Sequence, residues 1–138
     1  MYLLDTCAIA DFTKRDLYTL ERMKLIQPSE LYIASITLAE IEFGLVNNPR
    51  NALKTMPVIM QLLAATEMID FGYREAIVAG HIRHDLKISG LMIGKYDILI
   101  AATALVHDLI LVTSNVDEFS RIKGLKYENW RMPEEMVV

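Results

Sequence analysis

Five brief apolar segments, separated by longer stretches with helical periodicity, constrain the fold more than any other feature of this sequence. The apolar segments cover residues 2–4, 31–34, 68–69, 109–112 and 125–127. The stretches between them predict helices over residues 8–24, 37–46, 51–65, 74–87, 96–107 and 117–122. Short apolar runs bounded by polar or turn residues are typical of buried parallel strands. Because strands that alternate with helices indicate an α/β architecture, we expect an α/β fold around a parallel sheet.

Length and composition narrow the class of protein further. The chain has 138 residues, 53% of them hydrophobic and 23% charged, so residues 1–138 are expected to form one domain with its own core. The single cysteine, Cys7, excludes a disulfide framework and a cysteine-rich zinc module. The formal net charge is -4 and no block of lysine or arginine stands out. Binding of nucleic acid by bulk charge alone is therefore excluded.

The sequence also carries an expectation about location. No apolar run reaches the roughly 18 residues that a membrane span needs. The N-terminal residues 1–6 contain an acid and lack the basic region of a secretory signal. We therefore expect a cytoplasmic protein with no membrane attachment, and a lone cysteine agrees with a reducing compartment.

Acidic side chains gather where the predicted strands end. Asp5 directly follows the first strand, Glu40 lies in the helix after the second, and Asp97 opens the helix that leads into the fourth. The fourth strand is followed by a polar cluster of Asn115, Asp117 and Glu118. In open parallel sheets the ligand crevice lies beyond the carboxyl ends of the strands, so these groups can meet at one rim. Crowded carboxylates repel one another. An oxygen-rich site of this kind suits Mg²⁺ or Mn²⁺ and supports phosphate chemistry.

Each acid also has a structural interpretation. Asp5 can cap the helix that follows it, and Glu40 completes a capping-box pattern with Thr37. Glu42 lies nearer the apolar stripe of the same predicted helix, so both glutamates remain candidates on the residues alone. Asp97 is the least easily explained by structure, because the helix it opens is apolar almost all round and is therefore buried.

Four motifs in this order resemble those of PIN-domain ribonucleases, and most of all the VapC toxins of bacterial toxin–antitoxin pairs. The motifs are LLDT (3–6), ITLAEIEFG (36–44), IGKYDILIAA (93–102) and LVTSNVDEF (111–119). The ending GLKYENW (124–130) is also similar to that family. The resemblance implies a PIN-like α/β/α sandwich with a central parallel sheet of four to five strands.

The resemblance also assigns the candidate site. It makes Asp5, Glu40 and Asp97 the three central acids, and thereby prefers Glu40 to Glu42. The fourth position departs from the family pattern. The resemblance leaves it among Asn115, Asp117 and Glu118. The implied catalytic residues are Asp5, Glu40, Asp97 and Glu118. The implied metal ligands are Asp5, Glu40, Asp97, Asn115 and Asp117, around Mg²⁺ or Mn²⁺.

The function implied by the resemblance is metal-dependent hydrolysis of RNA phosphodiesters, with tRNA as the expected substrate. The family also implies a homodimer and a VapB-type antitoxin that blocks the site, with DNA contacted only through the antitoxin. Scattered bases at the rim of the site are the candidates for holding RNA: Arg83, Lys87, Lys95 and Arg121.

A different class of protein remains open as an alternative. A receiver-type signalling module is also a small parallel α/β domain with an acidic Mg²⁺ pocket, and it accepts a phosphoryl group on an aspartate. Asp70 closes the third predicted strand, where such a module keeps that aspartate, and Thr113 could act as its switch hydroxyl. Against this alternative, the first strand ends in one acid rather than an adjacent pair.

Overall fold

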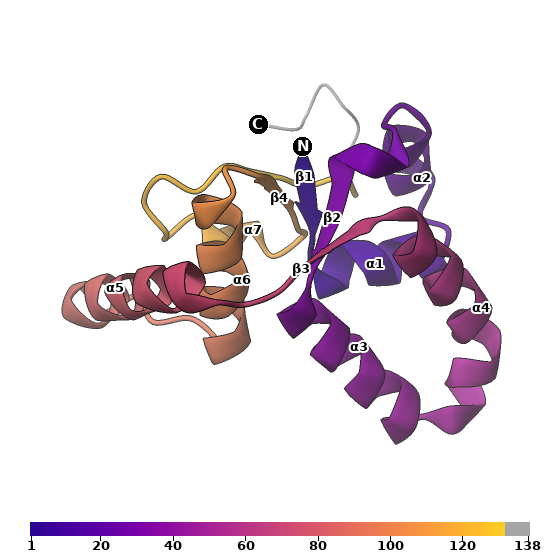
Figure 1. The fold of residues 1–138 in the computed structure, drawn as a ribbon, viewed down its shortest axis with the longest axis horizontal. Helices are drawn as coiled ribbons and strands as arrows, with labels where there is room; N and C mark the ends of the chain where they lie inside the picture. The colour runs from indigo at the N-terminus through magenta and orange to yellow at the C-terminus, as the bar shows by residue number, and fades with distance from the viewer. Residues whose placement is uncertain (132–138) are drawn as a thin grey trace.

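The strands of this protein form a five-stranded sheet in the order β3-β2-β1-β4-β5 (Figure 1). The protein was analysed as a computed structural model, which describes residues 1–131. The strands are β1 (Tyr2–Leu4), β2 (Leu31–Ala34), β3 (Glu67–Ile69), β4 (Ile110–Val112) and β5 (Tyr127–Glu128). Every neighbouring pair is parallel. The predicted parallel α/β sheet is thereby confirmed.

Helices cover both faces of the sheet. They are α1 (Thr6–Thr13), α2 (Leu17–Lys24), α3 (Ser35–Asn47), α4 (Pro49–Ala65), α5 (Tyr73–Ser89), α6 (Lys95–Val106) and α7 (Val116–Phe119). Figure 1 shows α5 and α6 on one side of the sheet, and α1, α2 and α4 on the other. Within the described residues, no helix combines the length and apolar character needed to cross a bilayer.

Two hydrophobic cores result from the alternation of side chains along the central strands. Leu3 and Leu111 pack into the core formed with α5 and α6, whereas their neighbours Leu4 and Val112 pack into the core formed with α1 and α4. All four side chains are at most 1% exposed. Since successive strand residues point to opposite faces, a central strand covered on both faces must be apolar at every position.

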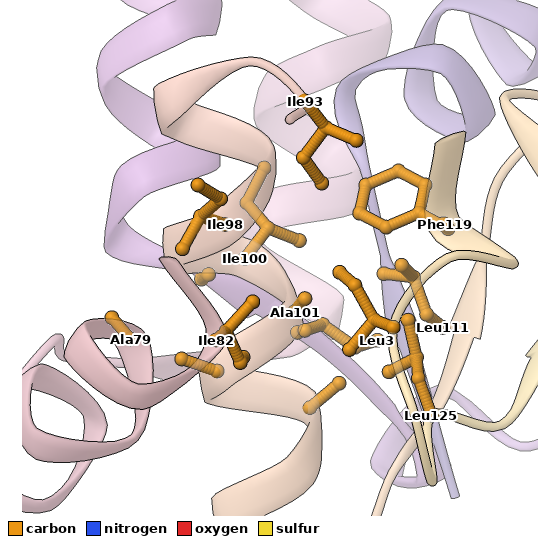
Figure 2. Packing of buried hydrophobic residues seen from close by; sticks show 14 of the residues in the cluster. Leu3, Ala79, Ile82, Ile93, Ile98, Ile100, Ala101, Leu111, Phe119 and Leu125 are labelled. Atoms are coloured by element: carbon orange, nitrogen blue, oxygen red, sulfur yellow. The ribbon is translucent and has the colours of Figure 1, made fainter. Parts of the chain in front are cut away.

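Small residues line the surface of α6 that packs against the sheet. Ala101, Ala102 and Ala104 are completely buried, and Figure 2 shows Ala101 beside Leu3. Helix α6 leads through a short turn into β4 and runs antiparallel to it. Its first turn, which carries Asp97, therefore lies at the carboxyl end of the sheet.

The single helix predicted over residues 8–24 is wrong, because the chain forms two helices there. Arg15 adopts a left-handed backbone conformation with φ of 60°, which ends α1. Asp16 then caps α2 by accepting hydrogen bonds from the Thr19 N–H (3.0 Å) and the Thr19 hydroxyl (2.8 Å). The helical spacing of apolar residues continues on both sides of this turn. The sequence pattern therefore predicted one continuous helix.

Two smaller differences concern the C-terminal third of the described chain. The fifth strand comes at Tyr127–Glu128 rather than at residues 125–127, because the Leu125 side chain packs into the α5–α6 core (8% exposed) before the strand begins. The helix predicted over residues 117–122 spans Val116–Phe119 instead.

The strand order contradicts the receiver-type alternative. In that fold the third strand lies inside the sheet, in the order 2-1-3-4-5. Here β3 is an edge strand, separated from β1 by β2, and the Asp70 that follows it is exposed. Asp70 therefore lies two strands away from Asp5, and no shared acidic pocket forms around it.

The α1–α2 break yields a stability prediction. Replacing Asp16 by alanine removes the acceptor for both Thr19 donors, so the free energy of unfolding should fall by about 1 kcal/mol. Chemical denaturation monitored by circular dichroism measures this change. The matched control is Asp117→Ala, which removes an exposed acid from the first turn of α7 and should change stability by less than about 0.5 kcal/mol. Equal effects of the two substitutions would contradict the capping role of Asp16.

Candidate active site

The candidate site lies at the point where the order of the strands reverses. The chain proceeds from β1 outward to β2 and β3, and then returns to place β4 on the other side of β1. The carboxyl ends of the two strands on either side of such a switch point leave a crevice between the loops that follow them. Asp5 follows β1 and Asn115 lies in the loop after β4, so both begin at this crevice.

Asp5 is the most buried of the acids, with 4% of its surface exposed. Its backbone N–H donates to the Val112 carbonyl (3.1 Å), which fixes the start of the loop against β4. Its Oδ1 accepts a hydrogen bond from the Ala8 N–H (2.8 Å), so Asp5 is the N-cap of α1. The capping interpretation is therefore correct for one oxygen, and the other carboxylate oxygen is not used by that cap.

Asp97 lies in the first turn of α6, which is capped at Gly94 without any side chain. A negative charge there interacts favourably with the positive end of the helix dipole. The middle of α6 is buried at Ile98 and over residues 100–104, and Asp97 is half-buried near the N-terminal end of the helix. The expectation that this acid is at least partly buried is confirmed.

The start of α3 decides between the two glutamates. Helix α3 begins at Ser35, so Thr37 lies inside its first turn and the expected capping box is wrong. In this register Glu40 is half-buried and its Oε1 accepts a hydrogen bond from the Thr6 hydroxyl (2.9 Å), which lies next to Asp5. Glu42 is exposed. The structure therefore directs Glu40, and not Glu42, toward the crevice.

Of the three polar residues after β4, Asn115 and Glu118 contact the site, whereas Asp117 does not. The Asn115 Nδ2 donates to Glu118 Oε2 (3.1 Å) and, at longer range, to Asp97 Oδ2 (3.5 Å). Asn115 stands at the N-cap position of α7, yet its side chain makes no cap and turns to these two acids instead. Asp117 is exposed, and within residues 1–131 its carboxylate forms no hydrogen bond or ion pair with the residues of the site.

Burial and nearby negative charges raise the pKa values of the two central aspartates. The pKa of Asp5 is raised to about 7, mainly by burial; a hydrogen bond from Thr113 opposes the shift, and the charges of Asp97 and Glu40 add to it. The pKa of Asp97 is raised to about 6, again mainly by burial, with Glu118 and Glu40 contributing. The charge interactions among Asp5, Glu40, Asp97 and Glu118 show that the four acids lie near one another at the carboxyl end of the sheet. A group that carries positive charge would therefore be strongly attracted there.

The donor set fits a hard divalent cation that keeps part of its water shell. Among the described residues, no three His, Cys, Asp or Glu side chains form a ready-made cage for a metal ion. Mg²⁺ does not require such a cage, because it is commonly held by one or two carboxylates, with water and substrate oxygens completing its shell. Asp5 and Asp97 supply such carboxylates, and their raised pKa values show that negative charge at this place lacks a partner.

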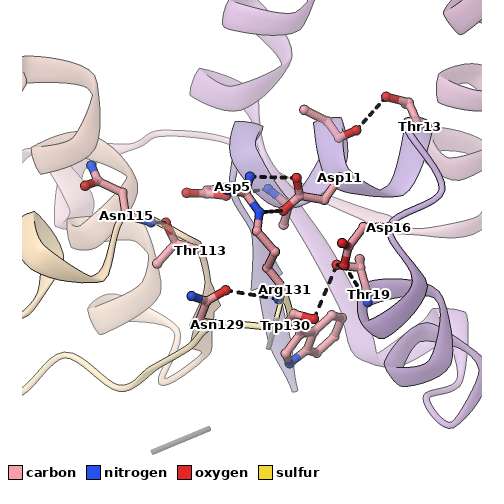
Figure 3. Close-up of polar contacts among 12 residues, drawn as sticks. Asp5, Asp11, Thr13, Asp16, Thr19, Thr113, Asn115, Asn129, Trp130 and Arg131 are labelled. Carbon is pink, nitrogen blue, oxygen red and sulfur yellow. Dashed lines mark hydrogen bonds and ion pairs between the residues drawn. The ribbon is translucent and has the colours of Figure 1, made fainter. Parts of the chain in front are cut away.

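Two hydroxyl residues belong to the site. Thr6 donates to Glu40, and Thr113 is 1% exposed and accepts from the Asn115 N–H (2.9 Å; Figure 3). Thr6 was missed on the sequence, and Thr113 was considered only as the switch hydroxyl of the receiver-type alternative. Thr113 directly follows β4, and only Asp5 separates Thr6 from β1, so their positions at the strand ends were the available signal. Of the bases expected at the rim, Arg121 donates to the Met92 carbonyl (3.2 Å), which ties the α7 region to the loop before α6.

Comparison with known proteins agrees with this geometry. The PIN domain model matches residues 2–125. Ribonuclease VapC2 of Rickettsia felis is 35% identical, covering 94% of this chain and 98% of the relative. The tRNA(fMet)-specific endonuclease VapC of Salmonella typhimurium is 32% identical, covering 94% of this chain and 97% of the relative. The crystal structure of VapBC2 from Rickettsia felis bound to a promoter DNA fragment matches with a TM-score of 0.84 and 31% identity, over 94% of this chain and 98% of that one.

A parallel sheet in this order, with carboxylates at its switch point, defines a PIN-type α/β/α protein. The chain belongs to the PIN-domain family, and within it to the VapC ribonucleases. The expected family and fold are thereby confirmed.

The raised pKa values predict that the metal-free protein loses stability as the pH rises. Between the unfolded pKa of Asp5, near 3.8, and its folded value of about 7, the folded state holds more protons than the unfolded state. The free energy of unfolding should therefore fall from pH 5 to pH 8, by about 2 kcal/mol from Asp5 alone. Denaturation in EDTA at several pH values measures this slope.

The control for this prediction is Asp5→Asn. Asparagine caps a helix as well as aspartate does, so the substitution removes the charge and keeps the bond to Ala8. The variant should be more stable than the parent at pH 8 and should show a flatter pH dependence. Titrating groups that do not interact with Asp5 contribute equally to both proteins and cancel. If the free energy of unfolding changed equally with pH in the parent and the variant, the pKa of Asp5 would not be raised by folding, and the prediction would be wrong.

Proposed function

We propose that the protein is an endoribonuclease that hydrolyses RNA phosphodiesters with the help of a divalent cation, Mg²⁺ or Mn²⁺. The observation that carries this proposal is the pairing of Asp5 and Asp97, two carboxylates with raised pKa values at the switch point of a VapC-family fold. The names of the relatives support ribonuclease activity, and the unbalanced negative charge supports the cation.

The roles of the residues follow from their positions. Asp5 and Asp97 are the carboxylates that would hold the cation, since they are the acids whose pKa values respond most to burial and to their neighbours. Glu40, kept in place by Thr6, faces the same volume and completes the negative charge. The Asn115 amide donates to both Asp97 and Glu118 and so links these two carboxylates. We leave Asp117 outside this set because it is exposed.

The chain's own groups orient the reaction rather than carry it out covalently. A divalent cation, when bound, lowers the pKa of water and stabilises negative charge on a phosphate. Asp5 and Asp97 would hold that cation beside the scissile phosphate, and Glu40 or Glu118 would accept a proton from the attacking water. The bond between phosphorus and the 3′-oxygen then breaks, and the leaving 3′-oxygen takes up a proton from solvent. The cleavage therefore needs no 2′-hydroxyl nucleophile, and we expect products with a 5′-phosphate and a 3′-hydroxyl.

The substrate that we propose is tRNA, because one of the relatives is named as a tRNA(fMet)-specific endonuclease. A folded RNA with exposed single-stranded loops also suits a small protein that reads unpaired bases. Since tRNA is a cytoplasmic molecule in bacteria, we place the protein in the cytoplasm.

A VapB-type antitoxin is the proposed regulator, with the protein as the toxin of the pair. A groove of about 460 Å³ lies between α1, α3 and α4, and its wall includes Thr6 and Glu40. Its floor is apolar, with Ile9, Ile41 and Ile59 among the lining residues. A peptide laid in this groove would reach the acids, and an arginine on it could pair with them bidentately.

Exposed apolar side chains on α3 and α4 support a proposal about how the protein assembles with a second copy and with the antitoxin. Large apolar side chains on α3 and α4 remain uncovered in the isolated chain: Phe43, Val46, Leu53, Met56 and Met60. Contiguous exposed apolar residues of this kind are typical of interaction surfaces. We therefore propose a homodimer that carries the antitoxin, with DNA contacted only through the antitoxin.

The two neighbouring glutamates give a matched test of catalysis. Glu40→Gln keeps the shape of the side chain and removes its charge from the site, so cleavage should fall by about 100-fold or more. Glu42→Gln makes the same chemical change one half-turn away on an exposed surface and should leave cleavage within about twofold. The measurement is the rate of cleavage of total tRNA in Mn²⁺, followed by mapping of the product ends.

The same assay separates the parts of the proposal. EDTA should stop cleavage by the parent protein, and Asp97→Asn should be inactive while remaining folded. Loss of activity in Glu42→Gln with full activity in Glu40→Gln would show that the wrong glutamate is assigned. Intact RNA after incubation of the parent protein with Mn²⁺ would contradict ribonuclease function itself.

A further inference from the structure

An ion pair with a buried acid and a half-exposed arginine joins α1 to the residues that follow the last strand. The Arg131 Nη2 donates to Asp11 Oδ1 (2.7 Å) and its Nε donates to Asp11 Oδ2 (3.1 Å), so the contact is bidentate (Figure 3). The Asp11 side chain is 9% exposed, whereas that of Arg131 is 52% exposed. The guanidinium therefore has one edge on a buried acid and the rest of its surface in solvent.

This pair lies beside the candidate site. Asp5 caps α1 and Asp11 lies six residues further along the same helix, a rise of about 9 Å. Cys7 and Asp11 are four residues apart and share one face of α1. The Asp11–Arg131 ion pair therefore lies less than two helical turns from Asp5.

The backbone that carries Arg131 is firmly held. The neighbouring Trp130 is 2% exposed, and its ring makes an edge contact with Tyr2 of β1 at a centroid distance of 5.2 Å. The Trp130 indole donates to Glu128 Oε1 (2.9 Å), and its carbonyl accepts from the Thr19 hydroxyl (3.4 Å). Because its backbone is fixed and Asp11 already orients its guanidinium, Arg131 loses little conformational entropy when it binds a second acceptor.

We propose that Arg131 binds an RNA phosphate next to the scissile one, with Asp11 holding the guanidinium in position for it. This inference rests on the proposed ribonuclease function. The acids repel the RNA backbone, and the protein carries a net charge of -4, so a fixed cation at the rim is needed to bring phosphates close. An arginine presents several N–H donors in one plane and can serve a carboxylate along one edge and a phosphate with the others.

A purely structural role for Arg131 makes a different prediction. If Arg131 only neutralises Asp11, its removal leaves a buried charge without a partner and destabilises the protein. Removal of both charges, in Asp11→Asn with Arg131→Ala, then restores stability and RNA binding together. If Arg131 contacts RNA, the double variant recovers stability but still binds RNA weakly.

The experiment measures binding of fluorescently labelled total tRNA by anisotropy, at several salt concentrations, with Asp97→Asn as the uncleaving parent. Adding Arg131→Ala should weaken binding about tenfold. It should also reduce the slope of log affinity against log salt by about 0.7, the contribution of one single-strand phosphate. Arg131→Lys, which keeps the charge, should recover part of the loss.

Two controls decide the outcome. Lys126 forms an exposed ion pair with Asp108 (3.1 Å) at the opposite end of the sheet, so Lys126→Ala removes one positive charge far from the site and should change binding by less than twofold. The variant with Asp11→Asn and Arg131→Ala should bind as weakly as Arg131→Ala alone. Binding restored to the parent's value in that variant would overturn the inference while leaving ribonuclease function intact. A protein that neither binds nor cleaves RNA before any substitution would instead refute the proposed function.

Discussion

The repulsion between buried carboxylates at the carboxyl end of the sheet is the interaction on which the site depends. Asp5 is nearly inaccessible to water and Asp97 is half-buried, and burial is the main reason that both pKa values are raised. The charges of Asp97 and Glu40 add to the shift of Asp5, and the charges of Glu118 and Glu40 add to that of Asp97. A fold that served stability alone would not place these charges together. A bound cation would relieve the repulsion among these carboxylates. The relief of this repulsion would then add to the affinity of the site for the cation.

The same residues build the fold and the site, which explains why the site tolerates so much charge. Asp5 caps α1 with one carboxylate oxygen, and its carboxylate also receives a hydrogen bond from Thr113, beyond the end of β4. Asp97 lies in the first turn of α6, where the positive end of the helix dipole offsets part of the repulsion from its neighbours. Asn115 holds a capping position but gives its side chain to Asp97 and Glu118. Local stabilisation of each acid thus offsets part of the repulsion among them.

Local signals in the sequence predicted the fold well and the site in part. Buried strands must be apolar at every position, so β1, β2 and β4 could be located, and the apolar helix after Asp97 marked that acid as unusual. The choice between Glu40 and Glu42 depended on the first residue of α3, which begins without a side-chain cap and so leaves no signal. The pair of Asp11 and Arg131 could not be predicted at all, because it joins residues 120 positions apart.

Proton release on cation binding tests the central claim most directly. Calorimetric titration of Mn²⁺ at pH 6.5, in two buffers with different heats of ionisation, counts the protons that leave the protein. Because Asp5 has a pKa of about 7 and Asp97 of about 6, a bound cation should displace protons from both, and the number should fall toward zero at pH 8.5. Binding of Mn²⁺ at pH 6.5 with no proton release, or equal affinity in a variant with both Asp5→Asn and Asp97→Asn, would contradict the account.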